Sequence, residues 1–185
     1  MVQEQIQDAR TRMHKAIESL RAELATVRSG RASPGLVDHL RVEYYGTPTP
    51  LMQLATIATP DARLIVIQPY DRGGISAIEK AILKSDLGLT PSNDGTVIRL
   101  SIPPLTEERR KELAKHVRQR VEDARVAVRN VRRDIHDHLR KMEHDHAISQ
   151  DELHRSETEL QKLTDEQIKD VDKIGEEKES ELLTV

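Results

Sequence analysis

The apolar positions in the first thirty residues recur mostly at intervals of three or four, which is the period of an amphipathic helix. They are Ile6, Met13, Ile17, Leu20, Leu24 and Val27. Gly30 can adopt the left-handed conformation that ends a helix, and Pro34 cannot continue one. The pattern therefore predicts one helix over roughly residues 2–29.

The pattern changes to a period of two after this helix, which indicates a strand. Leu40, Val42 and Tyr44 alternate with Arg41, Glu43 and Tyr45. This alternation predicts a half-buried strand. We expect the following segment 46–50, Gly-Thr-Pro-Thr-Pro, to break it.

Three further signals predict that a small α/β module continues to about residue 102. Residues 64–67, Leu-Ile-Val-Ile, indicate a short buried strand. A short helix follows from the spacing of three isoleucines and ends at Gly88; the three are Ile75, Ile78 and Ile82. After an Asn-Asp-Gly turn at 93–95, a last strand puts three apolar residues on one face. These are Ile98, Leu100 and Ile102.

A second long helix is predicted to begin after Pro103 and Pro104. Thr106 is a suitable N-cap, and Glu107 and Glu108 favour the first turn because the helix dipole is positive there. Its apolar stripe consists of Leu113, Val117, Val121, Ala124, Val128, Val131, Ile135 and Met142.

A third helix is predicted to begin at a capping box formed by Ser149 and Glu152. Ile148 and Leu153 occupy the two positions of a hydrophobic staple around that box. The apolar face continues through Leu160, Leu163, Val171 and Ile174.

These three helices are predicted to form one bundle, because an isolated helix cannot bury its own apolar stripe. The fold class we expect is α+β. Residues 1–30 and 105–185 form a long three-helix bundle, and residues 31–104 form an inserted α/β domain between the first two helices. At about 1.5 Å per residue, the second helix would be about 60 Å long. Both linkers fall at the same end of the bundle and predict a hinge, at Gly30, Arg31, Ser33, Pro34, Pro103, Pro104 and Leu105.

Composition narrows the class of protein. The chain has no cysteine, no Phe, no Trp and only three Tyr, so it carries no disulfide or thiolate chemistry and its core is aliphatic. No apolar run reaches membrane-spanning length, and the first thirty residues are too charged for a signal peptide. We therefore expect a monomeric cytoplasmic protein that does not contact a membrane.

The net charge of −3 conceals an asymmetry along the chain. Residues 105–141 contain 12 Lys and Arg against 7 Asp and Glu, a net charge of +5. Residues 142–185 contain 5 against 14, a net charge of −9. A chain that is locally basic but acidic as a whole favours one focused anionic partner over general affinity for nucleic acid.

The sequence contains no recognisable catalytic arrangement. It has no Gly-x-x-x-x-Gly-Lys phosphate loop and no Gly-x-Ser-x-Gly elbow, and cysteine nucleophiles are impossible. The pairs His136/His138 and His144/His146 are two residues apart, so on a helix their side chains diverge by about 200° instead of sharing a metal. We expect no enzyme activity, no cofactor and no metal site.

The clearest functional signal is a stripe of arginines on the second long helix. At 100° per residue its members fall within about 80° of one another; they are Arg118, Arg125, Arg129, Arg132 and Arg140. Arg110 and Arg133 flank the stripe, and Glu122 is the one acidic residue that intrudes on it. Because the guanidinium fork suits phosphate, the stripe is a candidate anion-binding face; a solvated face with ordinary ion pairs is the alternative.

If the anion is nucleic acid, the missing aromatic residues restrict how it is recognised. Readers of single strands stack bases on aromatic rings, and all three Tyr lie in the inserted module. Folded RNA read through phosphates and shape is the mode that remains. Arg28 and Arg31 lie about 30 Å or more from Arg129 by helix rise, and they either contact RNA or brace the hinge.

Six segments, in order along nearly the whole chain, resemble one known family. They are 28–34 (Arg-Ser-Gly-Arg-Ala-Ser-Pro), 42–51 (Val-Glu-Tyr-Tyr-Gly-Thr-Pro-Thr-Pro-Leu), 85–91 (Ser-Asp-Leu-Gly-Leu-x-Pro), 103–111 (Pro-Pro-Leu-Thr-Glu-Glu-Arg-Arg-Lys), 124–133 (Ala-Arg-Val-Ala-Val-Arg-Asn-Val-Arg-Arg) and 161–165 (Gln-Lys-Leu-Thr-Asp). Together they resemble the ribosome recycling factors, which act in protein biosynthesis after translation terminates. The stretch from His136 to His146 and the pair Gly73-Gly74 match no family segment.

The resemblance implies an L-shaped, non-enzymatic protein whose bundle binds large-subunit ribosomal RNA on the post-termination ribosome. It also implies that elongation factor G supplies the GTPase for subunit separation, and that initiation factor three prevents reassociation. The RNA-contacting arginine block of the family maps onto Arg132 first and then Arg129. Two other classes are weighed against it: a chaperone-like coiled coil, which the inserted module disfavours, and an enzyme with its site in that module, which lacks clustered His, Asp and Glu.

Overall fold

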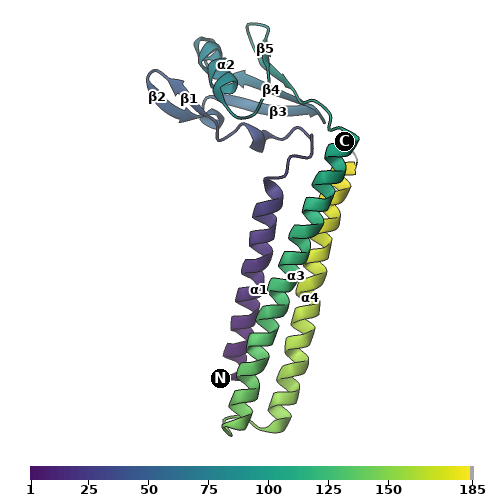
Figure 1. Cartoon of the computed structure of the whole chain (residues 1–185). Helices are drawn as coiled ribbons and strands as arrows, with labels where there is room; N and C mark the ends of the chain where they lie inside the picture. The colour runs from purple at the N-terminus through teal and green to yellow at the C-terminus, as the bar shows by residue number, and fades with distance from the viewer. Residues whose placement is uncertain (184–185) are drawn as a thin grey trace. The chain divides into compact units, whose positions relative to one another are not determined.

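The computed structural model describes residues 1–183, and the chain divides into two compact units. One unit joins Met1–Arg28 to the segment that begins at Glu107, and the other is Ser29–Thr106. The first unit contains three long helices that run side by side (Figure 1). These are α1 (Val2–Ala25), α3 (Glu107–His144) and α4 (Gln150–Leu183). The expected α+β fold, a helix bundle with a small sheet domain, is confirmed.

The predicted apolar stripes form the core of the bundle, with one exception. Every predicted stripe residue of α3 is buried except Met142, and the stripe instead continues through Leu139, which is fully buried. Met142 is half-buried because it lies where the chain turns: its carbonyl accepts the N–H of Ala147 at 2.8 Å. No helix of the described residues is long and apolar enough to cross a membrane.

The predicted capping box starts α4. The backbone N–H of Ser149 donates to the Glu152 carboxylate at 2.8 Å, and the N–H of Glu152 donates to the Ser149 hydroxyl oxygen at 3.2 Å. The first of these bonds is the main reason that the pKa of Glu152 lies below its ordinary value. Because both bonds satisfy N–H groups that a helix end leaves without partners, the prediction of this start is confirmed.

Helix α1 ends at Ala25, four residues before the predicted end. The N–H of Thr26 bonds to the Glu23 carbonyl at 3.2 Å, and that of Val27 bonds to the Leu24 carbonyl at 3.1 Å. These bonds span three residues instead of four, so the last turn is tightened. Val27 stays buried although it lies outside the helix, which explains why the apolar period continued past its end.

Helix α3 leaves no room for a side chain at Gly175 of α4. A Cβ atom at this position would lie 2.6 Å from Cγ2 of Val121, which is too short for any real contact. Glycine is therefore required here for space and not for its backbone freedom.

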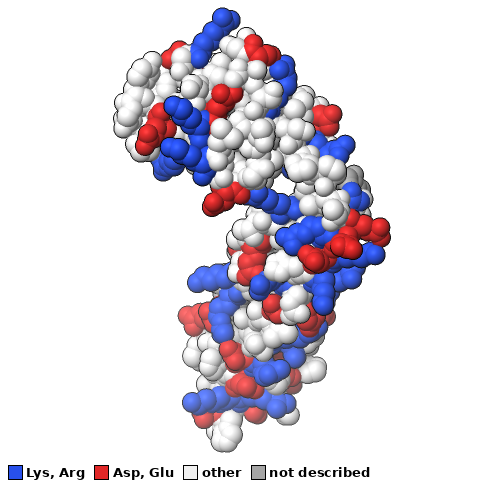
Figure 2. Space-filling view, turned by 45° about the horizontal axis from the view of Figure 1, so that its top comes forward, with Lys and Arg blue, Asp and Glu red and all other residues white. Residues whose placement is uncertain are grey.

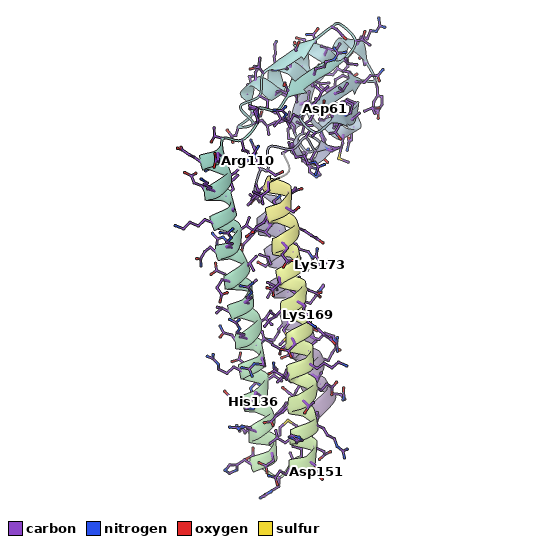
Figure 3. The ribbon with its side chains drawn as sticks, turned by 90° about the vertical axis from the view of Figure 1, so that its right-hand side faces the viewer. Asp61, Arg110, His136, Asp151, Lys169 and Lys173 are labelled. Carbon is purple, nitrogen blue, oxygen red and sulfur yellow. The ribbon has the colours of Figure 1, made fainter. Side chains whose placement is uncertain are left out.

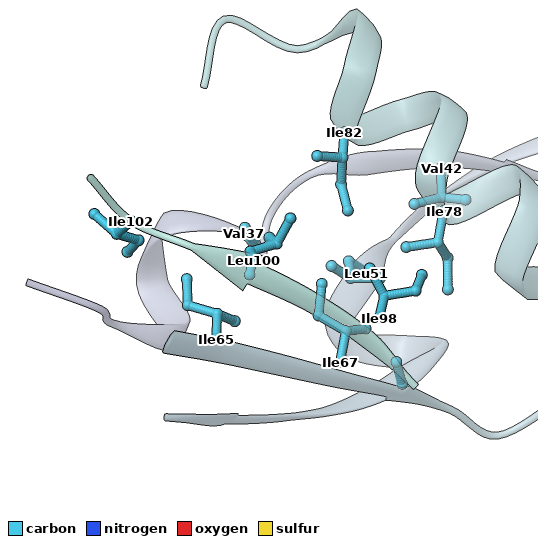
Figure 4. Packing of buried hydrophobic residues seen from close by; sticks show 11 residues of the cluster. Val37, Val42, Leu51, Ile65, Ile67, Ile78, Ile82, Ile98, Leu100 and Ile102 are labelled. Carbon is cyan, nitrogen blue, oxygen red and sulfur yellow. The ribbon is translucent and has the colours of Figure 1, made fainter. Parts of the chain in front are cut away.

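The second unit is built on a four-stranded antiparallel sheet with the order β3-β4-β6-β5. Its strands are β3 (Ala55–Asp61), β4 (Leu64–Pro69), β5 (Pro91–Asn93) and β6 (Ile98–Ser101). Helix α2 (Ile75–Lys84) packs on the sheet, and Ile78 and Ile82 meet the buried isoleucines of β4 and β6 (Figure 4). The predicted helix and both predicted strands are present, but α2 ends at Lys84 and not at Gly88, because Ser85 is already extended. Strands β3 and β5 were missed because their residues are mostly exposed and lack an apolar period.

A two-stranded hairpin completes the unit, with β1 (Arg41–Tyr44) antiparallel to β2 (Thr47–Pro50). The expectation that segment 46–50 only breaks the first strand is wrong. Tyr45 and Gly46 have φ of 49° and 78°, as in a tight hairpin turn, and the chain returns as a strand. The two prolines are tolerated because an edge strand has N–H positions that its neighbour does not use. Short 3-10 helices lie at Pro34–Leu36, Leu51–Gln53 and Arg72–Gly74.

Candidate nucleic-acid interface

The arginine stripe of α3 lies along its seam with α4. Arg125 donates from Nε to Asp172 of α4 at 2.8 Å, and Arg118 donates from Nε to Glu179 of α4 at 3.0 Å. The stripe therefore does not face solvent alone, because carboxylates of the next helix reach across to it. In a space-filling view of one face of the bundle, Lys and Arg are interspersed with Asp and Glu (Figure 2).

Glu122, the acidic residue within the stripe, holds two of its arginines. Its carboxylate accepts from Arg125 at 2.9 Å and from Arg129 at 3.3 Å. The hydrogen bond from Arg125 is the largest reason that the pKa of Glu122 lies below its ordinary value. The same contact, followed by that with Asp172, raises the pKa of Arg125. Glu122 and Arg125 are therefore both charged at neutral pH.

The end of the stripe near the α3–α4 turn is also paired. Nε of Arg140 lies 3.8 Å from the Glu157 carboxylate, and Nε2 of His136 lies 2.9 Å from it. His136 lies toward this end of α3 (Figure 3). No group of three or more possible metal ligands occurs in the part of the chain that the structure describes.

Arg132 differs from the other four arginines of the stripe. Its NH1 donates to the side-chain oxygen of Gln161 at 3.4 Å, and Gln161 is itself oriented by a 2.9 Å bond to Asp165. Within residues 1–183 no carboxylate lies within 4.0 Å of the Arg132 guanidinium. A neutral amide thus positions this arginine without cancelling its charge.

The remaining predicted RNA-contacting arginines lie outside the seam. Arg133 follows Arg132 on α3 and is exposed, and Arg110 lies half-buried near the start of α3 (Figure 3). Arg28 and Arg31 are both exposed and belong to different units, Arg28 to the helical unit and Arg31 to the other.

The residues predicted as a hinge form two linkers that meet inside the second unit. Gly30 has a φ of 74°, and a Cβ placed there would lie 3.0 Å from Cγ of Leu105. The N–H of Ala32 bonds to the Ala62 carbonyl at 2.6 Å, and that of Ile102 bonds to the Arg63 carbonyl at 2.8 Å. Within the second unit, both linkers are therefore hydrogen-bonded to the turn between β3 and β4. Ser33 caps the turn at Pro34 by accepting the Gly35 N–H at 3.3 Å.

Comparison with known proteins identifies the family. The sequence model of the family described as ribosome recycling factor matches residues 20–183. The chain belongs to the ribosome recycling factor family. The factor of Carboxydothermus hydrogenoformans is 56% identical over 185 residues, and that of Geobacillus kaustophilus is 57% identical over 185 residues; each match covers 100% of both chains.

Solved structures of ribosome recycling factors are similar along their whole length. A solution structure of the ribosome recycling factor gives a TM-score of 0.77 at 44% identity, with 100% of this chain and 98% of that chain covered. The T. thermophilus ribosome recycling factor, in models with the E. coli elongation factor G bound to the E. coli post-termination complex, gives 0.65 at 49% identity, with 99% of each chain covered. Ribosome recycling factors are translation factors and not enzymes, which confirms the expectation of a non-enzymatic protein.

The carboxylates that α4 presents to the arginines were missed in the sequence. Asp172, Glu179 and Glu157 belong to the acidic segment 142–185, whose charge was noted but not matched to the stripe. The sequence did contain a signal for this pairing, because the second and third helices have opposite net charges and were predicted to pack together. Which carboxylate meets which arginine depends on helix register, which the sequence pattern did not supply.

Proposed function

We propose that this chain is a ribosome recycling factor that binds the post-termination ribosome and, with elongation factor G and GTP, promotes its dissociation into subunits. The observation that carries the proposal is similarity over the full length, at 56% identity, to ribosome recycling factors. A related protein with 49% identity has been placed with elongation factor G on a post-termination complex. Action on ribosomes assigns the chain to the cytoplasm.

The bundle docks on large-subunit ribosomal RNA through α3, with Arg132 as the first phosphate contact. Its guanidinium is held by neutral Gln161, so a phosphate meets an oriented and uncompensated charge. Arg133 adds an exposed cation beside the half-buried Arg132. Half to two-thirds of the hydrogen bonds in protein–DNA contacts go to the backbone, and folded RNA is likewise read largely through phosphates and 2′-hydroxyls.

Arg129, Arg125, Arg118 and Arg110 form the wider RNA-facing surface. The side chain of Arg118 is 71% exposed and that of Arg129 is 46% exposed, and exposed ion pairs are weak. An RNA phosphate can replace the carboxylate as the partner of each arginine, but binding is then weakened because the displaced carboxylate stays nearby and repels the phosphate. Arg118, Arg125 and Arg129 therefore contribute less than Arg132. Arg28 and Arg31 supply a secondary contact or brace the linkers.

The inserted domain moves relative to the bundle at the two linkers when elongation factor G acts. The linkers comprise Gly30, Arg31, Ser33, Pro34, Pro103, Pro104 and Leu105, and two parallel connections permit swing while limiting free rotation. Initiation factor three then keeps the separated subunits apart. The protein acts as a monomer, without a cofactor or metal.

Light scattering of post-termination ribosomes tests this function. The reaction contains this protein, elongation factor G, GTP and initiation factor three, and we expect scattering to fall only when the protein and GTP are both present. The variant Arg132→Ala should slow the fall, and Arg118→Ala, whose arginine is already paired with Glu179, should slow it less. Ribosome binding with unchanged scattering would contradict the splitting role, and absence of binding would contradict the docking surface.

A further inference from the structure

The second unit contains a groove between the hairpin and α2. It has a volume of about 690 Å³, in the range that holds small ligands and short peptides. Strand β1 forms one wall and α2 the other, and the two elements pack beside each other. Ala77 and Ala81 line part of the helix wall, where their small side chains leave room for an incoming chain.

The prolines of β2 determine which way the backbone of β1 points. Antiparallel pairs alternate between those that exchange hydrogen bonds and those that do not. Arg41 is opposite Pro50 and Glu43 is opposite Pro48, and proline has no N–H to donate. The hydrogen-bonded pairs are therefore the alternate ones, so both N–H and C=O of Arg41 and Glu43 point away from β2.

A neighbouring bond supports this assignment. The N–H of Leu51 donates to the carbonyl of Leu40 at 2.9 Å, which continues the same alternation by one step. Outside the β1–β2 ladder, no backbone–backbone hydrogen bond of the described residues involves Arg41 or Glu43. The edge of β1 that is turned away from β2 thus carries two outward donors and two outward acceptors, whereas Pro48 and Pro50 remove the donors from the outer edge of β2.

The charges around the groove are mostly positive. Arg41, Lys80 and Lys84 line it together with a single carboxylate, that of Glu43. Within residues 1–183 none of these four groups has an ion-pair partner within 4.0 Å, in contrast with the arginines of the bundle seam. Lys80 and Lys84 are one helical turn apart on α2, about 6 Å, which is close to the spacing of alternate side chains along a strand.

We propose that the open edge of β1 and helix α2 bind an acidic, extended peptide segment of a partner protein as an added strand. Main-chain groups of the peptide pair with Arg41 and Glu43, and acidic side chains at alternate positions meet Lys80 and Lys84. Addition of a strand to an exposed sheet edge is a recurrent mode of peptide recognition. A protein segment is favoured over RNA because the groove has an open strand edge, apolar surface at Leu40, Ala77 and Ala81, and a carboxylate at Glu43. The proposal does not rest on the recycling function.

The test selects a displayed library of random dodecapeptides on the full chain and, in parallel, on Glu43→Pro. This substitution removes one outward N–H without touching the β1–β2 hydrogen bonds. We expect peptides with Asp or Glu at alternate positions to be enriched on the full chain and not on the variant. Tyrosine fluorescence, which reports only the inserted domain, checks that the variant is folded. Equal enrichment on both, or enrichment of peptides without acidic residues, would overturn the proposal.

The enriched peptide, made synthetically, then gives two independent readouts. Binding should weaken at least tenfold in Lys80→Glu/Lys84→Glu and stay unchanged in Lys15→Glu/Lys115→Glu, a matched charge change on exposed lysines of the bundle. The backbone amides of Arg41 and Glu43 should exchange hydrogen more slowly when the peptide is bound. Binding without that protection overturns strand addition, and displacement of the peptide by a 12-nucleotide oligouridylate shows that the groove prefers nucleic-acid phosphate.

Discussion

In the bundle, charged side chains of one helix meet those of the next, whereas the groove of the inserted domain leaves its cations without carboxylate partners. Arg118 and Arg125 each reach a carboxylate of α4. Lys80 and Lys84 have no such partner in the described residues. An anion must displace a carboxylate to reach Arg118 or Arg125, but only water to reach Lys80 or Lys84. The difference shows that a count of cations does not measure how available they are.

Truncation of a buried apolar side chain is expected to have the largest effect on the free energy of unfolding. It also tests whether the two regions unfold separately. Ile135 is fully buried in the bundle, and Ile67 is fully buried in the inserted domain. We expect Ile135→Ala to lower the free energy of unfolding of the bundle by about 2–5 kcal/mol, and Ile67→Ala to do the same to the domain.

Two spectroscopic signals distinguish these outcomes. Circular dichroism at 222 nm follows mainly the bundle helices, and tyrosine fluorescence follows only the domain because Tyr44, Tyr45 and Tyr70 all lie there. Each variant should shift one signal and leave the other in place. A common shift of both signals would mean that the two cores unfold as one cooperative unit.

Substitution of one glycine in each region is expected to lower the free energy of unfolding by a smaller amount. Gly175 is needed for space against Val121, and Gly46 is needed for its φ of 78° in a turn with open surroundings. We expect Gly175→Ala to destabilise the bundle by about 1–3 kcal/mol through overpacking. Gly46→Ala should destabilise the domain by about 1–2 kcal/mol, the penalty for a left-handed conformation.

Second substitutions distinguish these two causes. Combined with Val121→Ala, Gly175→Ala should cost less than the sum of the single changes, because the added methyl group then has room. Gly46→Asn should cost less than Gly46→Ala, since asparagine tolerates positive φ. Strict additivity at the first site, or equal losses at the second, would contradict the assigned causes. Chemical denaturation provides all of these free energies.

Sequence patterns predicted the bundle better than the inserted domain, for a physical reason. A helix buries one stripe with a period that is visible in a single segment, so the α3 stripe was correct from Leu113 to Ile135. A strand such as β3 is defined by its neighbour, and its exposed residues show no period. The same limit applied to the candidate site: the arginine stripe was visible on one helix, but its partners Asp172 and Glu179 depend on the register between two helices.

Salt dependence measures how available the bundle arginines are. Each phosphate that a protein contacts releases counterions, so the logarithm of the affinity falls with the logarithm of salt concentration by just under one per contact. We expect Arg132→Ala to weaken ribosome binding and to reduce that slope by just under one. Arg118→Ala should change the slope less, because Glu179 already pairs with that arginine at 3.0 Å. Equal changes for both variants would show that carboxylate pairing does not decide which arginine meets phosphate.

The smallest expected effect on stability comes from removing the Asp71 carboxylate of the inserted domain, which is hydrogen-bonded to two tyrosines. Asp71 accepts a hydrogen bond from the Tyr44 hydroxyl at 2.9 Å and a longer one from that of Tyr45 at 3.4 Å. The bond to Asp71 is the first cause that raises the pKa of Tyr44 to about 12. The pKa of Asp71 is lowered, first by the N–H of Gly73 and then by Tyr44.

The signs of these shifts set two pH ranges. The lowered pKa of Asp71 stabilises the fold above the ordinary carboxyl range, and that stabilisation is lost as the pH falls through the pKa of the folded state. The raised pKa of Tyr44 stabilises the fold below pH 10 or so, and that contribution is lost as the pH rises toward 12. Asp71→Asn should remove both dependences from the unfolding of the domain.

Absorbance at 295 nm follows the ionisation of tyrosine and tests the high-pH range directly. In the native protein we expect one of the three tyrosines to titrate near pH 12, and Asp71→Asn should return it toward the ordinary value of about 10. Asp61→Asn, which removes an exposed carboxylate that binds the Arg63 N–H instead of a tyrosine, should leave the titration unchanged. If Asp71→Asn also left it unchanged, a cause other than the carboxylate would hold the Tyr44 proton. The hairpin and the 3-10 turn at Arg72–Gly74 would then lack the side-chain link assigned to them here.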